Sequence, residues 1–347
     1  MLYVTTRIKQ DAFTANRALS ESRGPEGGFF LPMRLPRLNE SQIMALGEKS
    51  FSQNVADVIN LLFHAELDSW AVEFAIGRYP VQLVDIDSRT TVAETWHNPA
   101  WRFERLVRGV EKAIRQSDQI SKQPSDWLVI AARIAVLFGI FGDLIHSGAV
   151  SPENPMDIAV PSGNFSACAA AWYAREWGLP IGTIVVCCNE NGGVWNLFNK
   201  GEIRTGAVAA KTDTPDCDFA VPTDLERLIY GTLGAEETER FCEVCRRGGT
   251  YYLEPHQTAK LREGIYVSVV SQKRMESTIP HLYKFSGYLA DPYTALVYSG
   301  LIDYRSRTAE GKNVLIISDE SPAFSLGLLA RCLGMSPGEL KKRIEKG

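Results

Sequence analysis

The sequence predicts an α/β protein built around a parallel β-sheet. Three short runs are almost continuously apolar: residues 156–160 (MDIAV), 183–188 (TIVVCC) and 314–318 (VLIIS). Runs of this kind are typical of strands that a parallel sheet buries on both faces. An alanine-rich helix at residues 165–177 joins the first two runs into a strand–helix–strand unit. The rest of the chain is arranged around this unit.

Composition indicates a globular protein with a well-buried core. The 347 residues can form one large or two ordinary domains. Hydrophobic residues make up 45% and charged residues 22%, which are ordinary values for such a protein. The net charge of −4 gives no basic field for nucleic acid or for an anionic membrane. We therefore expect neither as a partner.

The cysteines favour a reducing compartment. Two of the seven, Cys187 and Cys188, are adjacent inside a predicted buried strand, which does not suit a disulfide framework. Cys242 and Cys245 form the one CxxC sequence, without a second pair or a nearby pair of histidines. These two are expected to be thiols on a surface helix. We expect a cytoplasmic protein without a metal site.

No targeting or membrane segment is apparent in the sequence. Residues 1–10 contain basic side chains, but no apolar stretch of a signal peptide follows them. The most apolar stretch, residues 128–141, contains Arg133 and is too short to cross a bilayer. The sequence therefore predicts no membrane span.

The first third of the chain predicts short mixed elements. Alternating or apolar runs predict strands at residues 1–7, 81–86 and 90–96, of which the last two form a hairpin. Helical spacing predicts helices at residues 11–22, 39–46, 51–63, 68–77 and 103–116. A polar linker, residues 118–125, follows. It divides the chain into an N-terminal region, residues 1–117, and a central and C-terminal α/β domain, residues 118–347.

The second region alternates helices and strands. Asp291 is a good helix N-cap with Pro292 at the first helical position, and Gly178 and Gly287 are expected to end helices. Further strands are expected at residues 251–255 and 265–271. Further helices are expected at residues 127–146, 194–200, 225–233, 235–247, 280–286, 291–301, 322–332 and 337–345.

The turn after the first buried strand, residues 161–164 (PSGN), is a candidate anion site. A strand-to-helix turn of this composition leaves backbone N–H groups free at the positive end of the helix, where phosphate or carboxylate binds. The alternative is a tight crossover turn without a ligand. The candidate binding residues are Ser162, Gly163, Asn164, Phe165 and Ser166.

Seven separate stretches resemble motifs of threonine synthase, and they keep the order of that family. They are residues 3–7 (YVTTR), 24–32 (GPEGGFFLP), 161–165 (PSGNF), 189–191 (NEN), 214–218 (TPDCD), 225–228 (LERL) and 287–295 (GYLADPYTA). The resemblance implies the fold-type II architecture of enzymes that use pyridoxal phosphate (PLP), as in the tryptophan synthase β subunit. It also implies that the turn at residue 162 is the loop that binds the PLP phosphate.

The segment that carries the PLP lysine in that family is altered here. The family pattern E-L-F-H-G-P-T-x-x-F-K-D corresponds to residues 94–105 (ETWHNPAWRFER), which places Glu104 at the lysine position. A carboxylate cannot form the covalent bond to PLP, and it repels the anionic cofactor. His97 stays in register with the family histidine. Glu104 and His97 are the candidate acid–base residues; alternatively, Glu104 is a surface charge and His97 shapes its loop.

A second part of the family's catalytic apparatus is missing from the sequence. The loop S-G-D-T-G-S-A, which holds the substrate carboxylate in threonine synthases, has no counterpart. Residues 127–141 match the family helix N-S-I-N-W-A-R-I-x-A-Q only at residues 132–134, and residues 318–324 (SDESPAF) match T-A-H-P-A-K-F poorly. The resemblance therefore implies that one subdomain is reduced or missing.

These observations leave three functions open. The first is a threonine synthase-like protein that has lost PLP-dependent activity and serves as a binding or regulatory homologue. The second is a lyase that eliminates phosphate from a small phosphorylated amino acid or similar ester, with Glu104 or His97 moving a proton. The third is an active threonine synthase. Loss of a subdomain uncovers apolar surface, so we also expect a homodimer.

Overall fold

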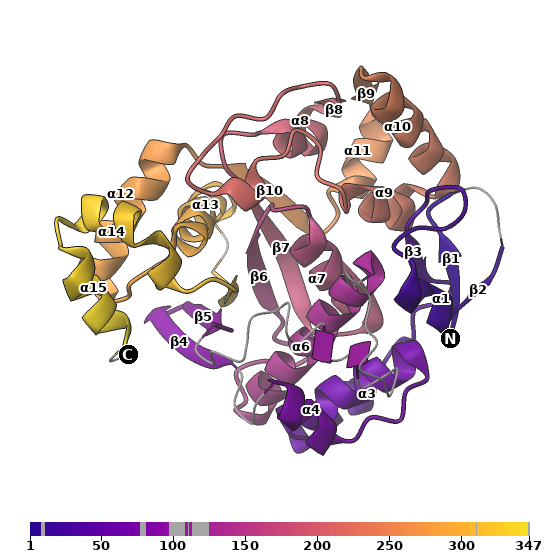
Figure 1. Ribbon diagram of the computed structural model, residues 1–347, viewed down its shortest axis with the longest axis horizontal. Coiled ribbons are helices and arrows are strands. Elements are labelled where there is room, and N and C mark those ends of the chain that lie inside the picture. Colours follow the sequence, from indigo (N-terminus) through magenta and orange to yellow (C-terminus); the bar gives the residue numbers. More distant parts are fainter. Residues whose placement is uncertain are drawn as a thin grey trace.

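A computed structural model of the protein describes residues 1–7, 11–76, 81–96, 108–109, 111–112, 125–309 and 311–345. Over these residues the chain has an α/β fold in which a central six-stranded sheet carries helices on both faces (Figure 1). The predicted domain boundary and most of the subdomain expected to be reduced lie outside the described residues, so both stay predictions.

The central sheet is mostly parallel, as the apolar runs predict. Its strand order is β10 (Ile265–Val269), β7 (Ile181–Cys188), β6 (Met156–Pro161), β11 (Val314–Ser318), β5 (Thr90–Glu94) and β4 (Gln82–Asp87). All neighbours are parallel except β4, which pairs with β5 as the antiparallel edge strand of the expected hairpin. Strand β5 of the N-terminal region is therefore a neighbour of β11, close to the other end of the chain.

The strands bury both faces in two separate cores. Along β6, Ile158 and Val160 face one core, which contains α6 (Asp126–His146), α7 (Ser166–Trp177) and α3 (Phe51–Phe63). Ala159 between them faces the other, which contains α12 (Gln272–Ser286) and α13 (Pro292–Thr308). This alternation follows from the two-residue period of a strand, and it explains why the run is apolar throughout.

Helix α6 passes through the first core. It has the length and composition of a helix that could cross a membrane, but 83% of its apolar window is buried inside the protein. It packs against α3 and α7. The helix expected at residues 127–146 is confirmed, and its 21 residues extend beyond the apolar stretch 128–141 that was judged too short to cross a bilayer. Its hydrophobicity is that of a core helix.

A small sheet forms the N-terminal edge of the molecule (Figure 1). It has the order β2 (Phe13–Thr14), β1 (Leu2–Thr5) and β3 (Phe30–Pro32). The Tyr3 hydroxyl donates to the carbonyl oxygen of Leu62 at 2.7 Å and accepts from Trp127 Nε1 at 3.1 Å. These bonds attach the small sheet to α3 and α6.

The remaining elements surround this frame. The helices are α1 (Ala15–Ser20), α2 (Glu40–Met44), α4 (Ser69–Ile76), α8 (Gly193–Lys200), α9 (Leu225–Leu233), α10 (Ala235–Arg247), α11 (Pro255–Leu261), α14 (Leu326–Leu333) and α15 (Pro337–Ile344). A two-stranded sheet joins β8 (Glu202–Arg204) to β9 (Thr250–Tyr252), and short 3-10 turns occur at Ala45–Glu48, Pro215–Cys217 and Pro322–Ser325.

Several sequence expectations about helices were wrong. The helix expected at residues 11–22 is shorter, because residues 13–14 form β2, and α11 was not expected. Helix α12 begins at Gln272, well before the predicted start at Pro280, because the Ser271 hydroxyl caps the amide of Arg274 at 3.3 Å. Pro280 lies within this helix rather than at its start. In α10, Cys242 is buried rather than at the surface, since that side of the helix faces the N-terminal segment through Arg7.

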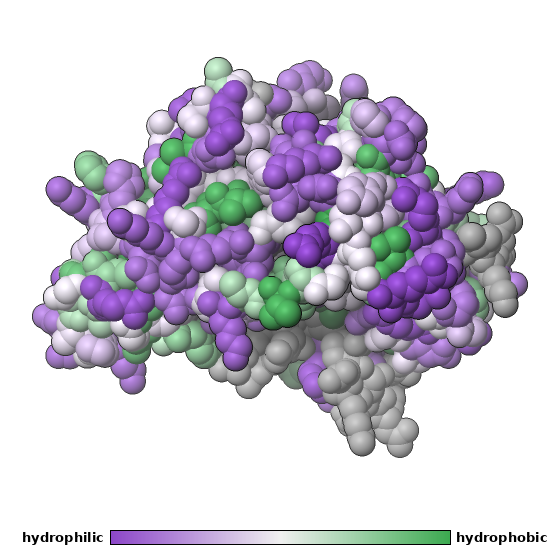
Figure 2. Space-filling model, turned by 90° about the horizontal axis from the view of Figure 1, so that it is seen from above, coloured by the Kyte–Doolittle hydropathy of each residue, from purple (hydrophilic) through white to green (hydrophobic). Residues whose placement is uncertain are grey.

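Figure 2 shows one face of the molecule, seen from above. It is mostly hydrophilic, with small apolar patches that are separate from one another. Patches of this size are ordinary on a protein surface.

Candidate functional site

The candidate site lies at the carboxyl ends of the parallel strands. In open α/β sheets this edge, just beyond the strand ends, is where ligands bind. Thr95 follows β5, Asp319 follows β11, Asn189 follows β7, and the loop of residues 162–166 follows β6. Because β5, β11, β6 and β7 are consecutive neighbours, these four positions are brought to one edge.

The loop of residues 162–166 is a tight turn that leads into α7. The amide of Ser162 donates to the carbonyl of Cys187 at 2.9 Å, and the amide of Phe165 donates back to the carbonyl of Ser162 at 2.8 Å. Gly163 and Phe165 have left-handed backbones, with φ of 46° and 75°. The Phe165 ring is fully buried against Phe198, which holds this uncommon backbone in place.

The same loop presents the positive end of a helix. Ser166 is the first residue of α7, and its amide donates to Asn164 Oδ1 at 3.1 Å. The next amides of the first turn have no partner within a helix, and the helix dipole favours negative charge at this end. The five predicted loop residues therefore form one tight turn at the positive end of α7.

A second loop, residues 212–218, supports the first. The amide of Gly163 donates to Cys217 Sγ at 3.4 Å. Asn189 Nδ2 donates to Asp218 Oδ1 at 2.7 Å and to Thr212 Oγ1 at 2.8 Å, so the second loop is fixed to the end of β7. The motifs NEN and TPDCD therefore shape the site through hydrogen bonds to each other.

An ion pair lies at the end of β11. Asp319 accepts from Thr95 Oγ1 at 3.0 Å through one carboxylate oxygen, and the other lies 2.5 Å from Arg133 Nη1 of α6. Both charged side chains are partly exposed, Arg133 to 20% and Asp319 to 33%. The sequence analysis noted Arg133 as a charge in an apolar run and within the match at residues 132–134. It did not predict the pairing, because the two residues lie far apart in the chain.

Buried hydroxyl and carboxyl groups lie behind this ion pair. Ser318 Oγ donates to Asp291 Oδ2 at 3.1 Å, and Asp291 caps α13 by accepting from the amide of Tyr293 at 2.8 Å. Burial raises the pKa of Asp291. Next to them, Tyr288 donates to the buried Glu94 Oε1 at 2.7 Å. The hydroxyl of Ser318 is therefore committed to structural hydrogen bonds.

Glu320 is a candidate acid–base group that the sequence analysis missed. Burial raises the pKa of its carboxyl to about 7, and the negative charges of Asp291 and Asp216 add to the effect. A carboxyl with this pKa can both accept and donate a proton near neutral pH. Its position two residues beyond a predicted buried strand was the available signal.

The candidates Glu104 and His97 lie outside the described residues. Every lysine within the described ranges is exposed at the surface. The described residues therefore fit the phosphate group of PLP, but they contain no buried lysine for its covalent attachment. Among them there is also no group of three or more histidine, cysteine, aspartate or glutamate side chains that could hold a metal ion.

Comparison with known proteins identifies the relatives of this chain. Residues 2–77 match the family model for the threonine synthase N terminus. The chain is 27% identical over 173 residues to threonine synthase of Pseudomonas aeruginosa, a match that covers 49% of this chain and 36% of the relative. It is 25% identical over 176 residues to human threonine synthase-like 1, which covers 49% of this chain and 23% of the relative. The match thus spans well under half the length of these curated relatives.

Two solved structures have the same fold. PLP-bound threonine synthase from Brucella melitensis superposes with a TM-score of 0.84 at 18% identity, covering 97% of this chain and 92% of the other. Threonine synthase from yeast superposes with a TM-score of 0.81 at 16% identity, covering 96% and 90%. The expected α/β architecture of fold-type II PLP enzymes is confirmed. The chain is therefore similar to the threonine synthases: residues 2–77 match the model for their N terminus, and the described residues have their fold.

Proposed function

We propose that this chain is a threonine synthase-like protein that has lost lysine-dependent PLP chemistry and binds a small phosphorylated molecule as a binding or regulatory homologue. The observation that carries the proposal is Glu104 at the position of the PLP lysine. A carboxylate has no amine to bond to the cofactor. The seven free cysteines support a reducing compartment, the cytoplasm, as the place where it acts.

The loop of residues 162–166 supports the binding half of this proposal. Its turn is held by backbone hydrogen bonds, by the buried Phe165 ring and by contact with Cys217. Such a loop needs no covalent anchor to hold a phosphate, because the helix dipole and the amides supply the attraction. The position of this loop at the N-terminus of α7 supports the proposal of an anion site that works without the covalent step.

Spectroscopy and binding test the two halves together. The purified protein is expected to be colourless, without the absorbance of a PLP aldimine near the edge of the visible spectrum. Isothermal calorimetry is expected to show that it binds inorganic phosphate. Asn164→Pro, which disrupts the loop, is expected to abolish phosphate binding, whereas Asn199→Ala on α8 is the matched control. A yellow protein whose colour disappears on borohydride treatment contradicts the first half. Equal phosphate binding by the Asn164 variant contradicts the second.

Glu320 supports a second candidate, a lyase that eliminates phosphate. The pKa of its carboxyl, raised by burial to about 7, makes Glu320 the proposed base for a proton on carbon. The electron pair of that C–H bond forms a carbon–carbon double bond while the C–O bond to phosphate breaks. The leaving phosphate carries the electron pair of the C–O bond, and the helix end at Ser166 stabilises its charge. Glu104 or His97 is the alternative base.

Phosphate release distinguishes these candidates. A lyase releases phosphate from O-phosphoserine or O-phosphohomoserine, and Glu320→Gln or Glu104→Ala lowers that rate at least tenfold, whereas the exposed Glu345→Gln does not. The binding proposal predicts background rates for all four proteins. Rescue of a threonine auxotroph would instead show that the chain is an active threonine synthase.

A further inference from the structure

Three of the motifs that resemble threonine synthase meet where the N-terminal segment contacts α9. The Thr6 hydroxyl donates to the Glu226 carboxylate of α9 and accepts from the amide of Phe29 at 2.8 Å. The Arg227 guanidinium lies 4.3 Å from the centre of the Phe29 ring, and its Nε donates to the carbonyl of Phe30 at 3.4 Å. All five residues are buried. The motifs YVTTR, GPEGGFFLP and LERL therefore form one set of contacts on α9.

Arg227 connects this set of contacts to the loop of residues 162–166. Its guanidinium forms an ion pair with Asp224, the residue that precedes α9. The amide of Asp224 donates to the carbonyl of Asn164, a loop residue, at 2.9 Å. Because an unpaired charge in a protein interior is strongly destabilising, the buried Arg227 and Asp224 are held together. The position of Asp224 beside the loop therefore depends on the position of Arg227.

The hydrogen bond from Asp224 orients the peptide group between Asn164 and Phe165. The N–H of this group belongs to Phe165 and donates to the carbonyl of Ser162 at 2.8 Å. Its C=O points in the opposite direction, as in any planar trans peptide group, and accepts from Asp224. Phe165 is the N-cap residue of α7. The peptide group that enters the helix is therefore held at both ends.

We propose that Arg227 is a positioning residue for the loop of residues 162–166. It holds Asp224, and Asp224 keeps the Asn164 carbonyl turned away from the N-terminus of α7. A carbonyl oxygen carries partial negative charge, so a rotated peptide group would repel an anion at this end of the helix. The N-terminal segment, which contacts Arg227 through Phe29, thereby controls the anion affinity of the loop. This role rests on the phosphate ligand proposed above and names the residues that regulate its binding.

Hydrogen exchange of the full chain without ligand tests the positioning. Phe29→Leu removes the aromatic face beside Arg227 but keeps the ion pair, so no unpaired charge is left in the interior. The peptide that contains residues 162–168 is expected to exchange at least about fivefold faster in this variant. Phe138→Leu is the matched control, because Phe138 is also buried but its ring packs on Trp177 at the other end of α7. Equal exchange of this peptide in wild type and Phe29→Leu, or equal acceleration in both variants, overturns the proposal.

Calorimetry with inorganic phosphate tests the control of affinity. Phe29→Leu is expected to bind phosphate at least about fivefold more weakly than wild type. The double variant Arg227→Met, Asp224→Asn, which removes the ion pair without leaving a buried charge, is expected to do the same. Phe138→Leu is expected to bind as wild type does, although it unfolds at a lower temperature. Phosphate affinity that is unchanged in Phe29→Leu and in the double variant refutes the control of binding. A wild-type protein that binds no phosphate contradicts the proposed function alone, and the exchange of residues 162–168 then decides whether Arg227 positions the loop.

Discussion

At the residue scale, the site depends on a few side chains in uncommon environments. Glu320 holds a proton to unusually high pH because it is buried beside other carboxylates. Gly163 has a backbone that other residues adopt only with strain. Glu320 and Gly163 both lie in loops that follow strands of the central sheet. The raised pKa of Glu320 and the left-handed backbone of Gly163 each have a consequence that can be measured.

Gly163→Ala is expected to destabilise the protein by about 1–2 kcal/mol, because alanine is strained at a φ of 46°. Space is not the obstacle, since the nearest atom to an added Cβ is the Asp216 carbonyl oxygen at 3.7 Å. Gly327→Ala in α14 is the control, because nothing lies within 4 Å of its added Cβ and its φ is not in the left-handed region. Chemical denaturation measures both, and equal effects would contradict the expectation.

The raised pKa of Glu320 predicts a pH dependence of stability. The folded protein keeps this proton up to about pH 7, whereas the unfolded chain loses it near the ordinary glutamate pKa of 4.5. The folded state therefore binds more protons across this window, and the free energy of unfolding falls as pH rises from about 4.5 to 7. Glu320→Gln is expected to remove this part of the decline. Thermal melts of both proteins between pH 5 and 8 test it, and parallel curves would contradict it.

At the scale of elements, the buried side chain of Arg227 joins α9 to the N-terminal segment. Arg227 is fully buried and forms an ion pair with Asp224, and its guanidinium lies 4.3 Å from the centre of the Phe29 ring. The carbonyl of Asn164 accepts from the amide of Asp224 at 2.9 Å. The loop of residues 162–166 is therefore connected to α9 through Asp224, and α9 is connected to Phe29 through Arg227.

Arg227→Met is expected to destabilise the protein by about 3–5 kcal/mol, because it leaves the buried carboxylate of Asp224 without its partner. Adding Asp224→Asn is expected to recover part of this loss, since the unpaired charge is then removed. Arg247→Met is the control, because its pair with Glu243 is exposed. Urea unfolding measures all of them. A double variant less stable than Arg227→Met alone would contradict the explanation.

The helices and strands also show which features of the structure could be predicted from the sequence. Apolar runs and caps predicted β11, α9 and α10 with the observed bounds, because burial and capping are local signals. The start of α12 was missed because Pro280 was taken as a first-turn residue. The turn at residues 162–166 was predictable from its Gly163-Asn164 sequence, which is typical of a strand-to-helix turn. The Arg133–Asp319 pair and the raised pKa of Glu320 were not, because they depend on which strands become neighbours.

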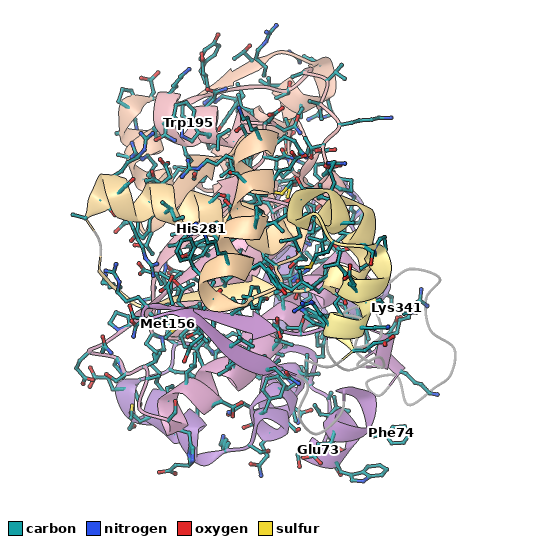
Figure 3. The ribbon with its side chains drawn as sticks, turned by 90° about the vertical axis from the view of Figure 1, so that its left-hand side faces the viewer. Glu73, Phe74, Met156, Trp195, His281 and Lys341 are labelled. Atoms are coloured by element: carbon teal, nitrogen blue, oxygen red, sulfur yellow. The ribbon has the colours of Figure 1, made fainter. Side chains whose placement is uncertain are left out.

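At the scale of the whole molecule, exposed aromatic side chains on α4 support the predicted homodimer. Trp70 and Phe74 are 70% and 83% exposed, and their rings stack at 5.7 Å. Figure 3 shows Phe74 projecting from the edge of the molecule. A second copy that covers these rings would remove their apolar area from water.

Light scattering after gel filtration is expected to give a mass near twice 38.5 kDa at micromolar concentration. The double variant Trp70→Ser, Phe74→Ser is expected to shift the mass to that of one chain. Phe285→Ser, which removes a ring that is also 72% exposed but lies on α12, is the control. A wild-type protein that elutes with the mass of one chain would contradict the predicted dimer.

The described residues have the fold of threonine synthase, while we propose that Glu104 stands at the position of the lysine that bonds to PLP in that family. The most direct test is whether PLP bonds covalently to this chain. The protein is expressed with excess PLP and reduced with borohydride, and its peptides are analysed by mass spectrometry. We predict that no peptide carries a reduced pyridoxyl group in the wild type, whereas Glu104→Lys acquires one at residue 104. A stoichiometric pyridoxyl group on any lysine of the wild-type chain would contradict the account.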